Sequence, residues 1–101
     1  MSEHDIEVCK QAIEKYGIKN QLVKTVEELS ELTKALCKYF ECTDKRMEPI
    51  ILDAIDEEMA DVEIMMRQLK MIFRNEEQIE ARHKEKIDRL ERRIKGGIYG
   101  V

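Results

Sequence analysis

The sequence predicts an all-α protein, a four-helix bundle that oligomerisation completes. Three observations indicate this class. Glu, Lys, Ile, Leu and Met dominate a chain that is 43% hydrophobic and 40% charged, with one Pro and four Gly. Apolar residues recur at helical spacing over long segments. Residues that typically begin or end helices lie between those segments. At 101 residues the chain is expected to form a single domain, residues 1–101.

The first predicted helix begins after Ser2 and runs to Tyr16. Serine is a favourable N-cap, and Glu3 and Asp5 complement the positive end of the helix dipole. Gly17 ends the helix, because glycine adopts the left-handed conformation without steric cost. The apolar side of this helix consists of Ile6, Cys9 or Val8, Ile13 and Tyr16.

The second predicted helix covers roughly residues 19–41. Its apolar residues follow a helical period and form one stripe, which consists of Leu22, Val26, Leu29, Thr33, Leu36 and Phe40. At about 100° per residue, Glu27 and Glu31 fall on the opposite side. Glu28 falls on the flank, near Gln21 and Leu32. The pattern therefore places the apolar stripe on one side of the helix and Glu27 and Glu31 on the other.

The third predicted helix opens with Pro49, in the first turn where proline is tolerated, and runs to about Phe73. Its wide apolar stripe consists of Ile51, Leu52, Ile55, Met59, Val62, Met65, Met66, Leu69 and Ile72. Glu58 and Asp61 fall within this stripe or at its edge. Ionised acids at a core-facing edge are costly unless they are paired or bind a metal.

The fourth predicted helix has Asn75 as its N-cap and ends at Gly96 and Gly97. Its inner side consists of Ile79, His83, Ile87, Leu90 and Ile94. The short apolar tail, residues 98–101, is expected either to fray or to lie across a partner subunit.

Charge and cysteine content narrow the class of protein. The net charge of −4 argues against a general nucleic-acid binder. Residues 48–63 hold seven acidic side chains and no basic one, whereas residues 82–95 hold seven basic and three acidic ones. The first segment suits a cation and the second suits a phosphate chain. The three cysteines form no framework, and no signal peptide or long apolar run is visible, so we expect reduced thiols in a cytoplasmic protein without a membrane partner.

Two pairs of carboxylates carry the strongest functional signal. Glu28 and Glu31 are three residues apart, as are Glu58 and Asp61, so each pair lies on one face of its helix. If the two helices are antiparallel, the four carboxylates converge and form the all-oxygen ligand set that Mg²⁺ or Mn²⁺ prefers. The alternative interpretation is a set of solvated helix faces, which is the fate of most glutamate runs.

These residues carry a resemblance to a known family. The pattern E-x-x-E with a preceding Glu, followed one helix later by E-x-x-D, resembles the all-α nucleoside triphosphate pyrophosphatases, the MazG-like group that includes dimeric dUTPases and dCTPases. The similar segments are residues 26–32, VEELSEL, and residues 57–62, EEMADV. The resemblance covers roughly residues 17–95 and implies hydrolysis of a nucleoside triphosphate to the monophosphate and pyrophosphate.

The resemblance also implies roles for individual residues. The metal ligands for Mg²⁺, with Mn²⁺ as an alternative ion, are expected to be Glu28, Glu31, Glu58 and Asp61. Glu27 then joins Glu28 and Glu31 in the catalytic set, as a carboxylate that takes a proton from the attacking water or binds a further ion. Lys86, Arg89 and Arg93 lie at spacings of three and four and are expected to grip the triphosphate; a solvated basic face is the alternative.

Contacts to the nucleobase are less well defined by the pattern. Gln21 is a candidate to bind a base edge, and Tyr16 or Tyr39 is a candidate to stack on the base; ordinary packing is the alternative for each. Glu80 and His83 form a single E-x-x-H unit, whereas a di-iron bundle needs two, so the pattern argues against di-iron chemistry.

Two functions from different classes remain open at this stage. The first is a Mg²⁺-dependent nucleotide pyrophosphatase, and the second is a non-catalytic helical interaction or regulatory module on the same fold. One bundle of this size would not cover the apolar arcs of both the second and the third helix. We therefore expect a homodimer or a tetramer built from dimers.

Overall fold

The structure is a computed structural model that describes residues 1–96, and these residues form four helices and no strand. The helices are α1 (Glu3–Tyr16), α2 (Ile18–Glu41), α3 (Glu48–Phe73) and α4 (Glu76–Gly96). The predicted all-α class is confirmed, and the predicted boundaries of α2 and α3 agree with the observed ones to within one residue. The predicted tail lies outside the described residues.

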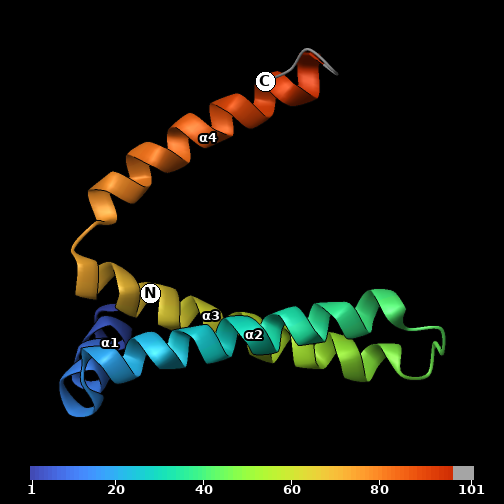
Figure 1. The fold of residues 1–101 in the computed structure, drawn as a ribbon, viewed down its shortest axis with the longest axis horizontal. Coiled ribbons are helices and arrows are strands. Elements are labelled where there is room, and N and C mark those ends of the chain that lie inside the picture. The colour runs from blue at the N-terminus through green and yellow to red at the C-terminus, as the bar shows by residue number, and fades with distance from the viewer. Residues whose placement is uncertain (97–101) are drawn as a thin grey trace.

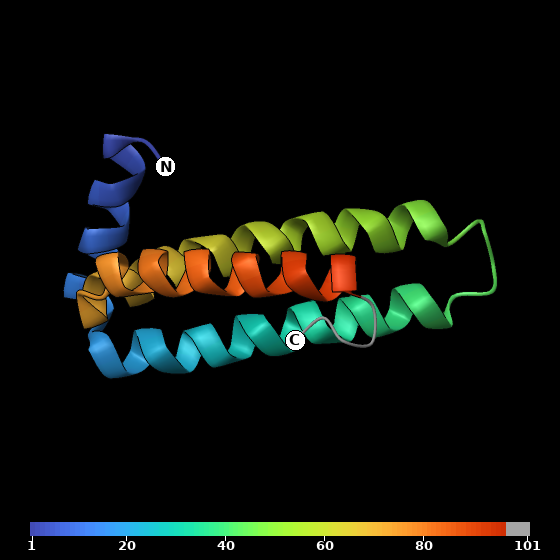
Figure 2. The same ribbon diagram turned by 90° about the horizontal axis from the view of Figure 1, so that it is seen from above.

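The helices are arranged around one long hairpin. α2 and α3 run antiparallel and lie side by side along most of their length (Figures 1 and 2). α1 packs across the end of the hairpin where α2 begins and α3 ends, whereas α4 diverges from the hairpin (Figure 1). The predicted four-helix bundle is therefore not closed within one chain.

The two ends of α1 are determined by local chemistry, as predicted. The Asp5 backbone N–H donates to Ser2 Oγ at 3.1 Å, and the Ser2 backbone N–H donates to Asp5 Oδ2 at 3.2 Å, which together make a capping box. Gly17 has a φ of 89°, a value that favours glycine, and its N–H donates to the Ile13 carbonyl oxygen at 2.9 Å. α2 can therefore begin directly after α1, at a new angle.

The junction between α3 and α4 differs from the prediction. Asn75 precedes α4, and its carbonyl oxygen accepts the Ile79 N–H at 2.9 Å, but Asn75 Oδ1 is buried without a hydrogen-bond partner. The predicted side-chain N-cap is therefore not formed. Arg74 takes a left-handed conformation with a φ of 51° and ends α3, while Arg67 Nη1 lies 2.8 Å from Glu76 Oε1 and ties the start of α4 to α3.

The face through which α2 packs on α3 is not the predicted apolar stripe. Five of the six members of that stripe are exposed, with Val26 at 63% and Phe40 at 72% accessibility. The residues that face α3 instead are buried or half-buried and consist of Gln21, Thr25, Glu28, Leu32 and Ala35. The apolar stripe alone does not identify the packing face, because both faces of α2 have a helical period.

The interface between α2 and α3 is small and partly polar. Its buried residues include Ala35, Met65 and the pair Gln21 and Gln68, whose side chains are joined by a hydrogen bond from Gln21 Nε2 to Gln68 Oε1 at 2.7 Å. Thr25 Oγ1 donates to the Gln21 carbonyl oxygen at 2.7 Å. In the described part of the chain no large side chain is completely buried.

The apolar residues of α4 are also placed differently from the prediction. Ile87, Leu90 and Ile94 were expected on an inner side, but all three are exposed, because α4 packs along none of the other helices. Among residues 1–96, no helix combines the length and the apolar character that a membrane span needs.

Candidate metal centre

Three carboxylates meet between α2 and α3, about midway along the hairpin. Glu28 on α2 and Glu58 and Asp61 on α3 each offer an oxygen, and these oxygens all lie within 4.8 Å of one another. Glu58 and Asp61 share a face of α3 because they are one helical turn apart. Glu28 meets them because it lies on the same inner face of α2 as Gln21. Of the four carboxylates expected to converge, the structure thus brings three into one group.

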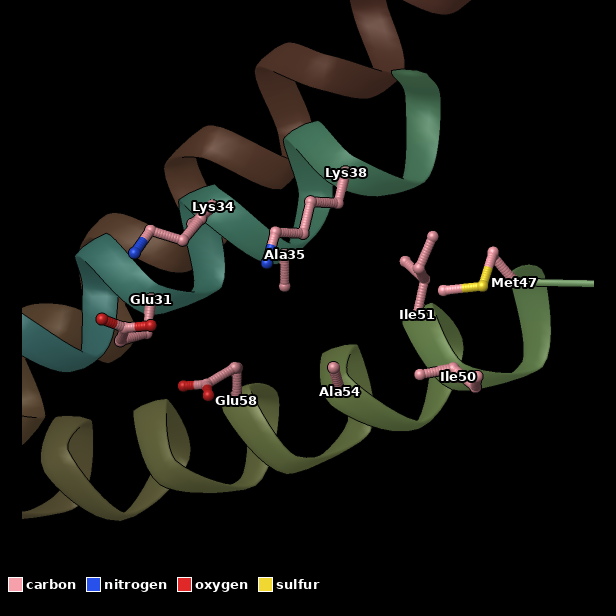
Figure 3. A pocket seen from close by; sticks show the side chains of 9 residues that line it. All are labelled: Glu31, Lys34, Ala35, Lys38, Met47, Ile50, Ile51, Ala54 and Glu58. Carbon is pink, nitrogen blue, oxygen red and sulfur yellow. The ribbon is translucent and has the colours of Figure 1, made fainter. Parts of the chain in front are cut away.

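Glu31, the fourth carboxylate of that set, lies next to the group but is exposed to solvent. Its side chain and that of Glu58 both extend into the space between α2 and α3, where they line one hollow (Figure 3). Its charge also contributes to the raised pKa of Glu58, which indicates that the two carboxylates interact.

The environment of Glu58 is unfavourable for its charge. Oε2 of Glu58 is buried and has no hydrogen-bond partner. Removal from water raises the pKa of this carboxyl group, and the neighbouring charges of Glu28 and Asp61 raise the pKa further. A divalent cation with oxygen ligands would satisfy the unpartnered oxygen and reduce the repulsion, so the residues present suit a cation of that kind.

One cation of the protein already contacts this group. Nζ of Lys24 lies 2.9 Å from Oε1 of Glu28, one turn away on α2. The hydrogen bond to Glu28 and the charge of that carboxylate raise the pKa of Lys24. Glu27 is exposed and is not a member of the three-carboxylate group, although its charge also contributes to the raised pKa of Lys24. Its predicted catalytic role stays a prediction.

Two hollows flank the acidic group along the hairpin. The first, with a volume of about 260 Å³, contains Glu31 and Glu58 together with two lysines of α2, Lys34 and Lys38 (Figure 3). Its other lining residues are apolar and consist of Ala35, Met47, Ile50, Ile51 and Ala54. We refer to it as the lysine hollow. The two lysines were missed in the sequence, although their positions three and seven residues after Glu31 place them near one side of α2.

The second hollow lies toward the beginning of α2. It has a volume of about 350 Å³ and is lined by Tyr16, Gln21, Lys24 and Met65. We refer to it as the tyrosine hollow. Tyr16 and Gln21, both predicted to contact a nucleobase, therefore share one hollow, although the Gln21 carboxamide is already hydrogen-bonded to Gln68. Tyr39 is exposed on α2.

The predicted phosphate-binding residues lie elsewhere. Lys86, Arg89 and Arg93 are exposed on α4, and the structure does not bring them to the acidic group of the same chain. Glu80 and His83 are also exposed on α4, and within residues 1–96 they belong to no group of three or more potential metal ligands.

Comparisons of this chain with protein-family models, with curated proteins and with solved structures found no match in any of the three. The functional argument therefore depends on the residues themselves and on the geometry of the site.

Proposed function

We propose that this protein is a Mg²⁺-dependent nucleoside triphosphate pyrophosphohydrolase of the MazG-like all-α type, which converts an NTP or dNTP to the monophosphate and pyrophosphate. The observation that carries the proposal is the convergence of Glu28, Glu58 and Asp61 from two helices, with one buried carboxylate oxygen unpartnered. Solvated glutamate faces do not require such burial. The motif resemblance described above favours the same chemistry.

Glu28, Glu58, Asp61 and the adjacent Glu31 would hold the ion. Bound there, Mg²⁺ would neutralise phosphate oxygens and lower the pKa of a coordinated water. Water adds to one phosphorus of the α–β anhydride, the bond from that phosphorus to the bridging oxygen breaks, and the water loses a proton. Glu27, an exposed carboxylate next to Glu28 in the sequence and not among these ligands, is the residue proposed to take that proton.

The two hollows support one orientation of the substrate. The lysine hollow offers Lys34 and Lys38 to the β and γ phosphates, which carry most of the charge. The tyrosine hollow offers an aromatic ring and an amide, which suit a nucleoside. Gln21 precedes Glu28 by seven residues and Lys34 follows it by six, so these two residues lie on either side of Glu28 at about 10 Å along α2. If a nucleotide binds with its base in the tyrosine hollow and its β and γ phosphates in the lysine hollow, its α–β bond would lie at the carboxylates of Glu28, Glu58 and Asp61.

We further propose that the active form is a homo-oligomer. α4 packs along no other helix of its own chain, and the apolar stripe of α2 is largely exposed. The predicted grip of Lys86, Arg89 and Arg93 on a triphosphate would then require α4 of another copy, because α4 diverges from the hairpin of its own chain (Figure 1).

An activity assay tests the catalytic proposal. The common NTPs and dNTPs, with dUTP, are incubated with the protein and Mg²⁺, and we expect monophosphate and pyrophosphate from at least one of them. EDTA should abolish the reaction. Formation of NDP and orthophosphate would overturn the proposal, and so would absence of any product, which is the result expected of a non-catalytic module.

The variant Glu58→Gln links the activity to the site. It keeps the shape of the side chain but removes one ligand charge, so turnover should be lost while Mg²⁺ no longer raises the melting temperature. Glu63→Gln, an exposed residue of α3 outside the group, is the matched control and should behave as wild type. If the Glu58→Gln variant were fully active, the proposal that α3 contributes a metal ligand to the site would be contradicted.

A further inference from the structure

The hairpin carries a further hollow at the loop that joins α2 to α3. It has a volume of about 440 Å³, and we refer to it as the loop hollow. Three of its lining residues, Lys38, Met47 and Ile51, also line the lysine hollow, so the two hollows adjoin (Figure 3). Its other lining residues come from the end of α2 and from the loop and consist of Glu41, Cys42, Thr43 and Asp44. The groove that holds the acidic group therefore continues past the lysines to the end of the hairpin.

Local hydrogen bonds hold the wall of the loop hollow in place. Asp44 Oδ1 accepts the Arg46 backbone N–H at 3.0 Å, and Asp44 Oδ2 lies 3.0 Å from Arg46 Nη2. These bonds lower the pKa of Asp44 below its ordinary value. The Asp44 carbonyl oxygen accepts the Met47 N–H at 3.0 Å and the Cys42 thiol at 3.2 Å. The hollow is thus formed before any ligand binds, which reduces the entropy lost on binding.

The side chains of the loop hollow suit a nucleoside better than a further phosphate. Cys42, Met47 and Ile51 offer an apolar wall to the face of a base. Thr43 offers a hydroxyl group, and Glu41 offers a carboxylate that accepts N–H or O–H groups of a base or a ribose. Within residues 1–96 Glu41 belongs to no ion pair, so its charge would repel a phosphate that entered the hollow.

Four regions follow one another along the hairpin from the beginning of α2. They are the tyrosine hollow, the acidic group, the lysine hollow and the loop hollow. In the proposed orientation, the nucleoside, the α–β anhydride and the outer phosphates occupy the first three. Lys34 and Lys38 are four residues apart, about 6 Å along α2, so each can contact a different phosphate. A group esterified to the outermost phosphate would therefore enter the loop hollow.

We infer that dinucleoside polyphosphates, in which three or four phosphates join two nucleosides, are substrates of this site, with the second nucleoside in the loop hollow. The inference rests on the proposed function, because it uses the same metal site and the same substrate orientation. Water adds to one phosphorus of the α–β anhydride, the bond from that phosphorus to the bridging oxygen breaks, and the water loses a proton. A triphosphate bridge then gives a monophosphate and a diphosphate, and a tetraphosphate bridge gives a monophosphate and a triphosphate.

Initial rates of product formation with Mg²⁺ test the substrate class. The substrates are an NTP and the dinucleoside triphosphate, tetraphosphate and diphosphate of the same base. We expect the tetraphosphate to give NMP and NTP, with a kcat/KM within about tenfold of that for the NTP. The dinucleoside diphosphate is the matched control, because it has the anhydride but no outer phosphate for Lys34 and Lys38. Its kcat/KM should be lower than that of the tetraphosphate by about tenfold or more.

Alkylation of Cys42 tests where the second nucleoside lies. Cys42 lines the loop hollow and is half-buried, whereas Cys37 is also half-buried but lines neither this hollow nor the lysine hollow. The ligands are analogues with a methylene group in the α–β bridge, which are not cleaved. The dinucleoside tetraphosphate analogue should slow alkylation of Cys42 by iodoacetamide severalfold, as measured by mass spectrometry. The NTP analogue should leave the rate at Cys42 unchanged, and Cys37 should react equally in all samples.

The outcomes separate this inference from the proposed function. If the NTP is hydrolysed and the dinucleoside polyphosphates are not, the inference is overturned and the proposed function stands. Two diphosphates from the tetraphosphate would mean that the central bond is cleaved, which contradicts the order of the hollows. Equal protection of Cys42 by the two analogues would exclude the second nucleoside from the loop hollow. Absence of product from every nucleotide overturns the proposed function and the inference with it.

Discussion

Lys24 Nζ lies 2.9 Å from Glu28 Oε1, so a cation of α2 partly neutralises the acidic group before any metal binds. Lys24 also lines the tyrosine hollow, which places it between the proposed nucleoside site and the carboxylates. Its charge should therefore compete with a divalent ion for Glu28. The Lys24 ammonium group and a divalent ion cannot both bind Glu28 Oε1 as strongly as either would bind it alone.

The first prediction follows from this competition. Lys24→Met should lower the Mg²⁺ concentration at which the melting temperature rises, by severalfold, because Glu28 is no longer engaged by an ammonium group. Without Mg²⁺ the same variant should be less stable than wild type, since three carboxylates then repel one another without compensation. Lys19→Met, an exposed lysine on the same helix, serves as the control. An unchanged Mg²⁺ dependence would show that Lys24 does not compete for the site.

The second prediction concerns the lysine hollow. Replacing Lys34 and Lys38 together by Met should weaken inhibition by pyrophosphate about tenfold or more, because charged hydrogen bonds to phosphate are lost. Inhibition by the nucleoside monophosphate should change little, since that product is proposed to occupy the tyrosine hollow. Lys10→Met on α1 is the control.

In the reverse pattern, inhibition by the monophosphate weakens and inhibition by pyrophosphate does not. That result would mean that the nucleoside occupies the lysine hollow and the phosphates occupy the tyrosine hollow.

The same assay on a triple Met variant of Lys86, Arg89 and Arg93 tests the role predicted for α4. Because α4 diverges from the hairpin of its own chain (Figure 1), an effect there would point to the α4 of another copy.

The third prediction addresses the buried amide pair. Gln68→Ala should cost about 1–3 kcal/mol of unfolding free energy, because the Gln21 carboxamide remains buried at 7% accessibility without its partner. Gln78→Ala, at an exposed position of α4, should change stability by less than about 0.5 kcal/mol. Urea denaturation measures both. Replacing Gln21 and Gln68 together by Leu should cost less than the sum of the two single Leu replacements, and strictly additive costs would mean that the hydrogen bond contributes nothing.

The fourth prediction is a pH dependence. The pKa of Glu58 is raised in the folded protein, so in the range between its ordinary and its raised pKa the folded state binds more protons than the unfolded state. Above the raised pKa, the ionised Glu58 therefore lowers the free energy of unfolding of the metal-free protein. This destabilisation disappears as the pH falls and Glu58 becomes protonated. Glu58→Gln should melt a few degrees higher than wild type at neutral pH.

That difference in melting temperature should shrink toward zero as the pH falls through the raised pKa of Glu58, because the protonated carboxyl group resembles the amide. Thermal melts of both proteins in EDTA, from neutral to mildly acidic pH, measure it. The lowered pKa values of Asp44 and Glu76 act in the opposite direction but are common to both proteins, so they cancel in the comparison. A difference that grows at acidic pH would contradict the assignment.

Features that depend on a few neighbouring residues were predictable from the sequence. Ser2 and Asp5 form the cap at the start of α1, Gly17 takes the positive φ that ends it, and Pro49 lies in the first turn of α3. Each involves groups within about four positions along the chain, where backbone geometry leaves little choice. The side-chain cap at Asn75 was the exception, since its side chain turned inward at the junction.

The orientation of α2 was not predictable in the same way. Its sequence has two faces with a helical period, one through Leu29 and Leu36 and one through Gln21 and Ala35. Hydrophobicity alone favours burial of the face with Leu29 and Leu36, whereas the structure buries the face with Gln21 and Ala35. The choice depends on what α3 presents, namely Gln68 as a partner for Gln21 and a surface that small side chains can approach closely. This complementarity depends on the sequences of α2 and α3 together, so the sequence of either helix alone does not predict it.

The sequence by itself determined that Glu58 and Asp61 lie on one face of a helix, because the period of 3.6 residues places them there whatever surrounds them. It also determined the all-α class, through composition and spacing. Only the tertiary structure decided that Glu28 joins that pair within 4.8 Å, that Lys24 forms an ion pair with Glu28, and that Lys34 and Lys38 share a hollow with Glu58. The physical reason is that a helix fixes angles among its own residues, whereas the antiparallel register of α2 on α3 fixes which carboxylates share the same small volume.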